Sequence, residues 1–306
     1  ADTPEKRRGV GIAWGGFNVT EGGGDSAEVA LELMPGNKIR KYDTWHAMGQ
    51  GATTGSLVVT LEALKEMHLT PEDIQLIQND TKTCPDTGMA GASRSLYMDG
   101  NATIIAANKL LAAMRKEDGT LRTYDEMKAE GIETKYLGRY ETNTTPGLCR
   151  LDPNTGIGDP TPAFTYCLNL AEVEVDTKTG KTTVLKFTCV DFVGRIGNID
   201  AVNGQAYSGI MHGIGFALKE DYADVKKHAN MFGAGTSYIK DVPDDINLIH
   251  IDGAISDGPF GSSGASEAFQ ASGHCAVLNG IYNACGVRIH EIPALPEKIK
   301  AGLDAI

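Results

Sequence analysis

The 306-residue chain carries a net charge of −12 at pH 7, with 41% hydrophobic and 22% charged residues. This composition predicts a soluble globular protein with one large or two medium-sized domains, and the negative charge argues against nonspecific nucleic-acid binding. No apolar run approaches the roughly 20 residues of a membrane span, no leader-like segment is visible, and the cysteines and histidines lack metal-binding spacing. We therefore expect a cytoplasmic protein, with a periplasmic location as the alternative, and no metal bound by side chains alone.

The first 140 residues predict alternating strands, turns and helices. Apolar residues at every second position indicate strands, and apolar residues three or four positions apart indicate helices with one buried face. Pro35 and Gly36 predict a hairpin turn between the second and third strands, and charged residues 1–8 are expected to be loose. The expected strands cover residues 9–17, 27–33, 38–45, 74–79 and 136–141, the expected helices cover residues 56–68, 93–116 and 124–130, and residues 18–25 form a glycine-rich turn.

The second part of the chain begins with a polar loop that extends to Pro162. The clearest hairpin of the sequence follows, because Val173 and Val175 alternate with acidic residues before a turn and a returning strand. The expected strands cover residues 170–176, 182–192 and 246–251, and the expected helices cover residues 202–220, 266–285 and 295–303. The whole pattern predicts an α+β protein made of two α/β-like lobes with mixed sheets, residues 1–140 and 141–306.

The stretch from His46 to Gly55 is the first candidate binding site. It joins an expected strand to an expected helix, whose first amide N–H groups lack intrahelical partners and whose dipole favours an anion. Gly49 and Gly51 let the backbone approach a ligand, and Gln50 adds an amide that donates and accepts hydrogen bonds. We expect a phosphate or a phosphate-bearing cofactor here, although such glycine turns also occur without a ligand.

A second candidate site lies at the start of the expected helix at residues 93–116. Ser93, Arg94 and Ser95 place two hydroxyls and a guanidinium in its first turn, after a glycine-containing loop. Arginine offers a planar fork of donors that suits a phosphate or a carboxylate. The alternative is an ordinary helix cap with Arg94 in a surface salt bridge.

Two later loops carry the remaining candidates. Asn198 and Gln205 follow a polar loop at residues 191–197, which suits hydrogen bonding to a ligand but also an ordinary connection between a strand and a helix. Glu267 falls in the first turn of an expected helix, after a flexible glycine and serine loop. A glutamate in such a position can act as a general base, but acidic residues are also simply favoured at helix N-termini.

Together and in this order, these stretches resemble the C-terminal molybdopterin-binding half of the xanthine oxidase family, which is the second molybdopterin-binding domain of molybdenum hydroxylases. Within that family, they are most similar to bacterial aldehyde oxidoreductases. The residues that carry the resemblance are Met48-Gly49-Gln50-Gly51, Thr87-Gly88, Gly91-Ala92-Ser93-Arg94-Ser95, Asp191, Gly194, Asn198, Gln205 and Gly264-Ala265-Ser266-Glu267.

The resemblance implies a role for each stretch. Glu267 would lie beside a molybdenum ion and act as the base that activates its bound hydroxyl or water. Gly49, Gln50 and Gly51 would contact the pterin. The other implied cofactor contacts are Ser93, Arg94, Ser95, Asn198, Gln205, Ala265 and Ser266. Because the sulfurs of the cofactor hold the metal, no metal-ligating side chain is implied.

The resemblance also implies a larger enzyme that binds molybdopterin cytosine dinucleotide with molybdenum and oxidises aldehydes to carboxylic acids with oxygen from water. Electrons would pass to two-iron two-sulfur clusters, which no cysteine spacing in these residues could hold, and then to an external acceptor. The first half of the molybdenum domain, with a phenylalanine-glycine turn and an arginine near the metal, is also missing. We expect the C-terminal part of a longer, homodimeric protein, or one chain of a complex, without activity of its own.

Two other interpretations stay open. Gly49, Gly51 and Gly55 could form the dinucleotide fingerprint of a nicotinamide-dependent dehydrogenase. The preceding strand is polar at Lys41 and Asp43, however, where a buried parallel strand is normally apolar. A noncatalytic molybdopterin-binding module is the third interpretation, and it would need no glutamate beside the metal.

Overall fold

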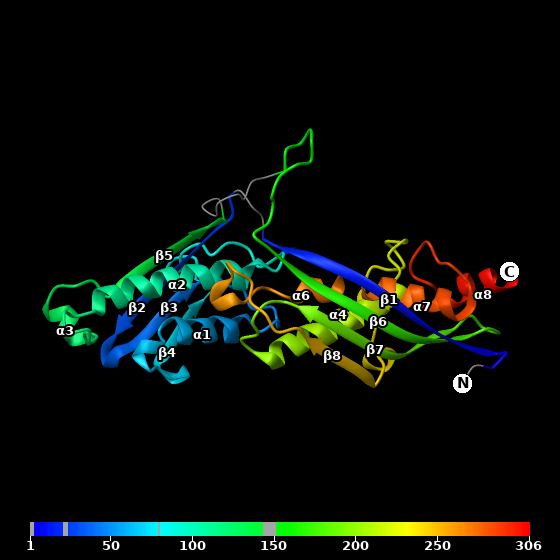
Figure 1. The fold of residues 1–306 in the computed structure, drawn as a ribbon, viewed down its shortest axis with the longest axis horizontal. Helices are drawn as coiled ribbons and strands as arrows, with labels where there is room; N and C mark the ends of the chain where they lie inside the picture. The colour runs from blue at the N-terminus through cyan, green and yellow to red at the C-terminus, as the bar shows by residue number, and fades with distance from the viewer. Residues whose placement is uncertain (1–2, 21–23, 79, 143–150) are drawn as a thin grey trace.

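The computed structural model describes residues 3–20, 24–78, 80–142 and 151–306, which form two mixed four-stranded sheets. Figure 1 shows the two sheets one after the other along the long axis of the molecule, each with helices packed against it. Both ends of the chain lie at the same end of the molecule, beside the second sheet (Figure 1). The predicted α+β class with mixed sheets is confirmed.

The first sheet consists, in order, of β4 (Ile74–Gln78), β3 (Lys38–Asp43), β2 (Ser26–Met34) and β5 (Lys135–Glu141). Neighbouring strands are antiparallel, except for the parallel pair of β3 and β4. The helices of this lobe are α1 (Ala52–Ala63), α2 (Arg94–Met114) and α3 (Tyr124–Ala129). Leu31 and Leu33 of β2 share a buried core with Leu110 of α2, so the alternation of the strand meets the apolar stripe of the helix.

The polar residues of β3 are buried and not exposed to solvent. The Lys41 ammonium lies 2.6 Å from the Asp99 carboxylate and 3.2 Å from the Asp43 carboxylate, and all three side chains are fully buried. Asp43 also accepts hydrogen bonds from Ser56 and Gln78. Ion pairs and hydrogen bonds satisfy these buried groups, so the polarity of the strand does not by itself argue against a parallel pairing.

The second sheet consists, in order, of β1 (Lys6–Val19), β6 (Ala163–Asp176), β7 (Thr182–Phe192) and β8 (Asp245–His250). The pair of β7 and β8 is parallel, and the others are antiparallel. One face of this sheet is covered by α4 (Ile199–Leu218), α6 (Ser266–Gln270) and α7 (Gly273–Cys285). A Cβ on Gly11 of β1 would lie 2.0 Å from the Ala276 carbonyl oxygen, so glycine is what allows β1 to pack so closely on α7.

The remaining elements are short. They are α5 (Met231–Ala234), α8 (Pro296–Asp304) and 3-10 helices at Pro35–Asn37, Lys65–Met67, Pro71–Asp73, Ile239–Asp241 and Pro259–Gly261. Of the helices in the described residues, none is long and apolar enough to cross a membrane.

Several expected element boundaries are wrong, and the strand expected at residues 170–176 begins already at Ala163. Residues 6–8 are not loose, because they are the first residues of β1. Lys6 there forms an ion pair with Glu174 of β6. The expected helix at residues 266–285 is two helices, because buried Ser272 has a nonhelical backbone and its hydroxyl accepts a hydrogen bond from Asn169. Helix α1 begins at Ala52, four residues before the expected start, because the helix follows directly on the glycine turn.

The N-terminal strand does not follow the expected division into residues 1–140 and 141–306. Strand β1 pairs with β6 along its whole length, so residues 6–19 belong to the sheet of the second part. The division itself stays a prediction. Parts of the expected glycine turn (residues 21–23), fourth strand (residue 79) and polar loop (residues 143–150) lie outside the described residues.

Candidate functional site

The glycine turn before α1 is held by its own glutamine. Gly49 and Gly51 have φ angles of 100° and 91°, which residues with a Cβ rarely adopt. The Gln50 amide accepts a hydrogen bond from the Met48 N–H at 2.5 Å and donates one to the His46 carbonyl at 2.7 Å. Open space lies beside Gly49, since a Cβ there would have no neighbour within 4 Å. The turn is therefore preformed and accessible.

This turn lies against the first residues of α4, where the two lobes meet (Figure 1). A Cβ on Gly51 would lie 3.4 Å from the Ala201 side chain. Asn198, a predicted cofactor ligand, is the N-cap of α4, and its side-chain oxygen accepts a hydrogen bond from the Ala201 N–H at 3.0 Å. The N-termini of α1 and α4 thus approach each other, and the amide groups at both ends favour an anion between them.

One turn further along α4, Gln205 contacts the loop that carries Glu267. The Ser266 hydroxyl donates a hydrogen bond to the Gln205 side chain at 2.8 Å. Ala201 and Gln205 are four residues apart and so lie on the same face of the helix. The predicted glycine turn and the predicted glutamate loop are therefore brought together along this face.

Glu267 is half-buried at the start of α6, and its carboxylate accepts a hydrogen bond from the Ser93 hydroxyl. Ala92 and Ser93 have φ angles of 51° and 50°, an uncommon conformation for residues with side chains. A Cβ on Gly264 would lie 1.8 Å from the Ser93 carbonyl oxygen. Only glycine at position 264 therefore permits this approach of the two loops.

Ser263, in the same loop, is buried, and its hydroxyl has no hydrogen-bond partner in the described structure. Buried hydroxyls without a partner are rare, because desolvation of the group is then uncompensated. Ser263, four residues before Glu267, therefore has hydrogen-bonding capacity for a bound ligand. Ala265 directly precedes α6, and Ser95 lies half-buried in the first turn of α2.

Arg94 holds loops of the protein with its whole guanidinium. Its Nε and Nη2 atoms each lie 2.7 Å from an oxygen of the Asp25 carboxylate. The other donors bond to the carbonyls of Ser26, Thr87 and Met89 at 2.8 to 3.0 Å. All five N–H groups of an arginine are accounted for in this way. No donor of Arg94 is left for the predicted contact to a cofactor.

The sequence pointed to Asp191 but not to His250, which contacts it, or to Asn203, which contacts the other nitrogen of His250. The ring nitrogens of His250 each lie 2.8 Å from an oxygen, one on Asp191 and one on Asn203. Burial raises the pKa of the Asp191 carboxyl, and the neighbouring His250 partly offsets this shift. The bridge connects the ends of β7 and β8 to the first turn of α4. It depends on the parallel register of β7 and β8, for which the sequence has no signal.

In the described residues, no group of three or more His, Cys, Asp or Glu side chains could hold a metal ion. The assembled loops instead combine the N-termini of two helices, a glycine turn, the unpaired hydroxyl of Ser263 and the carboxylate of Glu267. Such a site suits a large anionic ligand with an acid–base group at one end.

Comparison with known proteins agrees with this arrangement. The family model described as "Molybdopterin cofactor-binding domain" matches residues 1–243. A curated aldehyde oxidoreductase from Megalodesulfovibrio gigas is 40% identical over 303 residues, which are 99% of this chain and 33% of that protein. The crystal structure of the aldehyde oxidoreductase from Desulfovibrio desulfuricans matches with a TM-score of 0.93 and 43% identity, covering 98% of this chain and 33% of that one. A structure of the Desulfovibrio gigas aldehyde oxidoreductase matches with a TM-score of 0.95 and 39% identity over 99% of this chain and 33% of that one.

The chain thus spans about a third of the length of these relatives. The resemblance inferred from the four sequence stretches is confirmed, and a nicotinamide-dependent dehydrogenase is not supported. This chain belongs to the molybdopterin cofactor-binding domain family and, with it, to the xanthine oxidase family of molybdenum hydroxylases.

Proposed function

We propose that this chain is part of a molybdenum hydroxylase that oxidises aldehydes to carboxylic acids, and that Glu267 is its catalytic base. The observation that carries the proposal is the meeting of the Gly49–Gly51 turn, the Ser93 turn and the Glu267 loop along the first turns of α4. The name of the relative from Megalodesulfovibrio gigas, which is 40% identical, supports the substrate class.

The cofactor of this proposal is molybdopterin cytosine dinucleotide with molybdenum. The open space beside Gly49 and the paired N-termini of α1 and α4 suit its pyrophosphate. The unpaired Ser263 hydroxyl offers a further donor or acceptor. In this proposal the sulfurs of the cofactor hold the metal, so no metal-ligating side chain is required. The residues proposed to contact the cofactor are Gly49, Gln50, Gly51, Ser93, Ser95, Asn198, Gln205, Ala265 and Ser266.

When bound, the cofactor supplies a Lewis-acidic metal that accepts two electrons from the substrate. Conversion of an aldehyde and water into a carboxylic acid also releases two protons, so a base is needed beside the reacting carbon. Glu267 takes up one of these protons in our proposal. Ser93 orients the Glu267 carboxylate through its hydroxyl, and the Ser266–Gln205 hydrogen bond fixes the adjacent backbone to α4.

Arg94 has a different role in this proposal from the one expected from the sequence. Because its five donors bond to Asp25 and to loop carbonyls, it positions the Ser93 turn and does not bind the cofactor itself. The same ion pair ties the start of α2 to the beginning of β2. The cofactor site therefore depends on Arg94 indirectly.

The rest of the enzyme is also part of the proposal. Since the chain spans about a third of its relatives, we assign the other wall of the cofactor cleft to the remaining part of the molybdenum domain. Two-iron two-sulfur domains or subunits would carry electrons to an external acceptor, and the complete enzyme would be a cytoplasmic homodimer.

The proposal is tested on the complete enzyme by measuring its molybdenum content and the mass of the organic cofactor released on denaturation. We expect about one molybdenum per copy of this chain and a cytosine-containing dinucleotide, with turnover of a panel of aldehydes. Release of a pterin without cytosine would contradict the proposed dinucleotide form of the cofactor. Bound molybdopterin without turnover of any aldehyde would favour a noncatalytic binding module.

A further inference from the structure

In the part of the chain that the structure describes, the helices that contact the second sheet all pack on one of its faces. The helices α4, α6 and α7 all pack on the face that carries the buried residues of β1 and β6, such as Gly11 and Val173. On the opposite face, the side chains of β1 and β6 that the structure describes are exposed or half-buried. An antiparallel sheet with one solvated face normally alternates apolar residues inside with polar residues outside.

One half of this open face departs from that alternation, because it carries exposed apolar and aromatic side chains. Ile12 and Trp14 of β1 are 54% and 66% exposed, and Phe164 and Tyr166 of β6 are exposed beside them. The Trp14 and Tyr166 rings stack with centroids 5.6 Å apart, and the Phe164 and Tyr166 rings with centroids 6.3 Å apart. We call Ile12, Trp14, Phe164 and Tyr166 the aromatic face. Contiguous exposed patches of this kind mark interaction surfaces.

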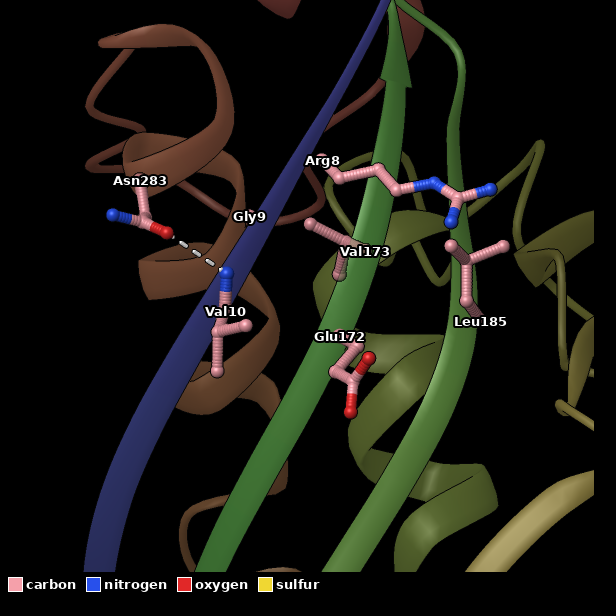
Figure 2. Close-up of a pocket in the computed structure, with 7 residues that line it drawn as sticks. All are labelled: Arg8, Gly9, Val10, Glu172, Val173, Leu185 and Asn283. Carbon is pink, nitrogen blue, oxygen red and sulfur yellow. Dashed lines mark hydrogen bonds between the residues drawn. The ribbon is translucent and has the colours of Figure 1, made fainter. Parts of the chain in front are cut away.

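The other half of the open face is charged. Lys6 and Arg8 of β1 pair with Glu174 of β6, and a depression of about 140 Å³ lies between Arg8, Val10, Glu172 and their neighbours (Figure 2). Its lining combines the polar side chains of Arg8, Glu172 and Asn283 with the apolar side chains of Val10, Val173 and Leu185. The ion pairs of Lys6 and Arg8 with Glu174 distinguish this half from the half that carries the aromatic rings.

Side chains of α7 occupy part of the β1 edge of the sheet. Asn283 of α7 accepts a hydrogen bond from the Val10 N–H at 2.9 Å, as Figure 2 shows, and Asn279 donates one to the Ile12 carbonyl at 2.9 Å. These side chains satisfy backbone groups that a partner strand would need. Beside the aromatic face, a partner therefore packs more readily on the face of the sheet than along the β1 edge.

The aromatic face lies at the end of the sheet that leads into the cofactor loops. Strand β1 ends at Val19, and the next residue, Thr20, donates a backbone hydrogen bond to the Ala92 carbonyl at 3.2 Å. Ala92 precedes Ser93, the residue that contacts Glu267. A polypeptide that forms the opposite wall of the cofactor cleft would approach this same end of the molecule. About two thirds of the length of the relatives lies outside this chain and could supply it.

We propose that the aromatic face is buried in the complete enzyme by the polypeptide that forms the opposite wall of the cofactor cleft. The proposal rests on the proposed function in taking this chain as one part of a larger molybdenum enzyme. The occupant presents an apolar surface that packs flat on Ile12, Trp14 and Tyr166. The charged half of the open face stays in contact with solvent.

The test uses thiol labelling of the complete enzyme. Ile12→Cys places a thiol in the aromatic face, and Thr183→Cys places a matched thiol in an exposed strand position on the charged half of the same face. Each variant is treated with N-ethylmaleimide, and the modified peptide is quantified by mass spectrometry, so that native cysteines do not interfere. We expect labelling at position 12 to be about tenfold slower than at position 183, because a buried interface thiol reacts only when the interface opens.

Equal labelling rates at the two positions would overturn the proposal. A second copy of the chain is the other possible occupant. It would give protection that disappears when the enzyme is diluted until homodimers dissociate, and this result would also overturn the proposal. Protection that persists in the monomeric enzyme supports it. Labelling requires no turnover, so it stays informative even if Glu267 proves not to be the base.

Discussion

Replacement of Arg94 distinguishes a residue that positions loops from one that binds the cofactor. Arg94 is 3% exposed, and its partner Asp25 keeps 21% of its side chain exposed. Removal of one member of a buried, hydrogen-bonded ion pair costs about 3 to 5 kcal/mol, and the partial exposure of Asp25 places Arg94→Met near the lower end, at about 3 kcal/mol. Asp25→Asn should cost a similar amount, because it leaves the guanidinium without its counter-charge.

Urea unfolding followed by tryptophan fluorescence measures these changes, and the double variant completes a mutant cycle. Because Arg94 also bonds to three loop carbonyls, the double variant should lose little more stability than Arg94→Met alone. The content of bound cofactor in the complete enzyme is the second readout, and it should fall to a similar extent in both single variants. If Asp25→Asn retained the cofactor while Arg94→Met lost it, Arg94 would bind the cofactor directly, and our assignment would be refuted.

Two further predictions concern packing and pH. Gly264→Ala should lower turnover and thermal stability, because its Cβ would lie 1.8 Å from the Ser93 carbonyl oxygen. The control Gly204→Ala lies inside α4, where its Cβ would meet no atom within 4 Å, and it should raise stability by about 0.5 to 1 kcal/mol. Equal effects of the two substitutions in thermal denaturation would disprove the packing argument. Burial raises the pKa of Asp99 from 3.8 to about 6, and Lys41 opposes this shift. The folded chain therefore binds this proton more tightly than the unfolded chain, and the resulting stability is fully present below pH 3.8 and is lost as the pH rises through about 6. The melting temperature of Asp99→Asn should accordingly depend less on pH between 5 and 7 than that of the unmodified protein, and an unchanged dependence would contradict this assignment.

The elements of the fold were largely predictable because their signals are local. The hairpin at residues 170–192 follows from the alternation of valines and acidic residues, and β6 and β7 form it. Helix α2 follows from its apolar stripe, with boundaries within two residues of the expected ones. Each of these patterns lies within a short stretch of chain, where periodicity alone decides which side chains can be buried together.

The placement of β1 could not be predicted in the same way. Its partner β6 begins more than 140 residues later, and the pairing depends on the match of Gly9 and Gly11 to the backbone of α7. The burial of Lys41 in β3 has a similar cause. Asp99, which neutralises it, comes from a helix far along the chain. Contacts between distant segments leave no periodic signal.

For the site, the sequence indicated the stretches but not their connections. Glycine turns and helix N-termini marked residues 46–55, 93–95 and 264–267 as candidates, and the structure brings these stretches together. The hydrogen bond between Ser93 and Glu267 and the complete engagement of Arg94 by Asp25 depend on side-chain geometry. Residue type alone could not separate a residue that binds a cofactor from one that positions a loop.

The central claim is that Glu267 is the base of an aldehyde-oxidising molybdenum site, and Glu267→Gln in the complete enzyme tests it most directly. Glu297→Gln is the matched control, because Glu297 is an exposed glutamate in the first turn of α8. We predict that both variants keep the molybdenum content of the unmodified enzyme, and that Glu267→Gln alone lowers kcat for aldehydes by about 10² to 10⁴-fold, the usual contribution of a general base. Aldehyde turnover within about twofold of the control, with normal molybdenum content, would contradict the role of Glu267.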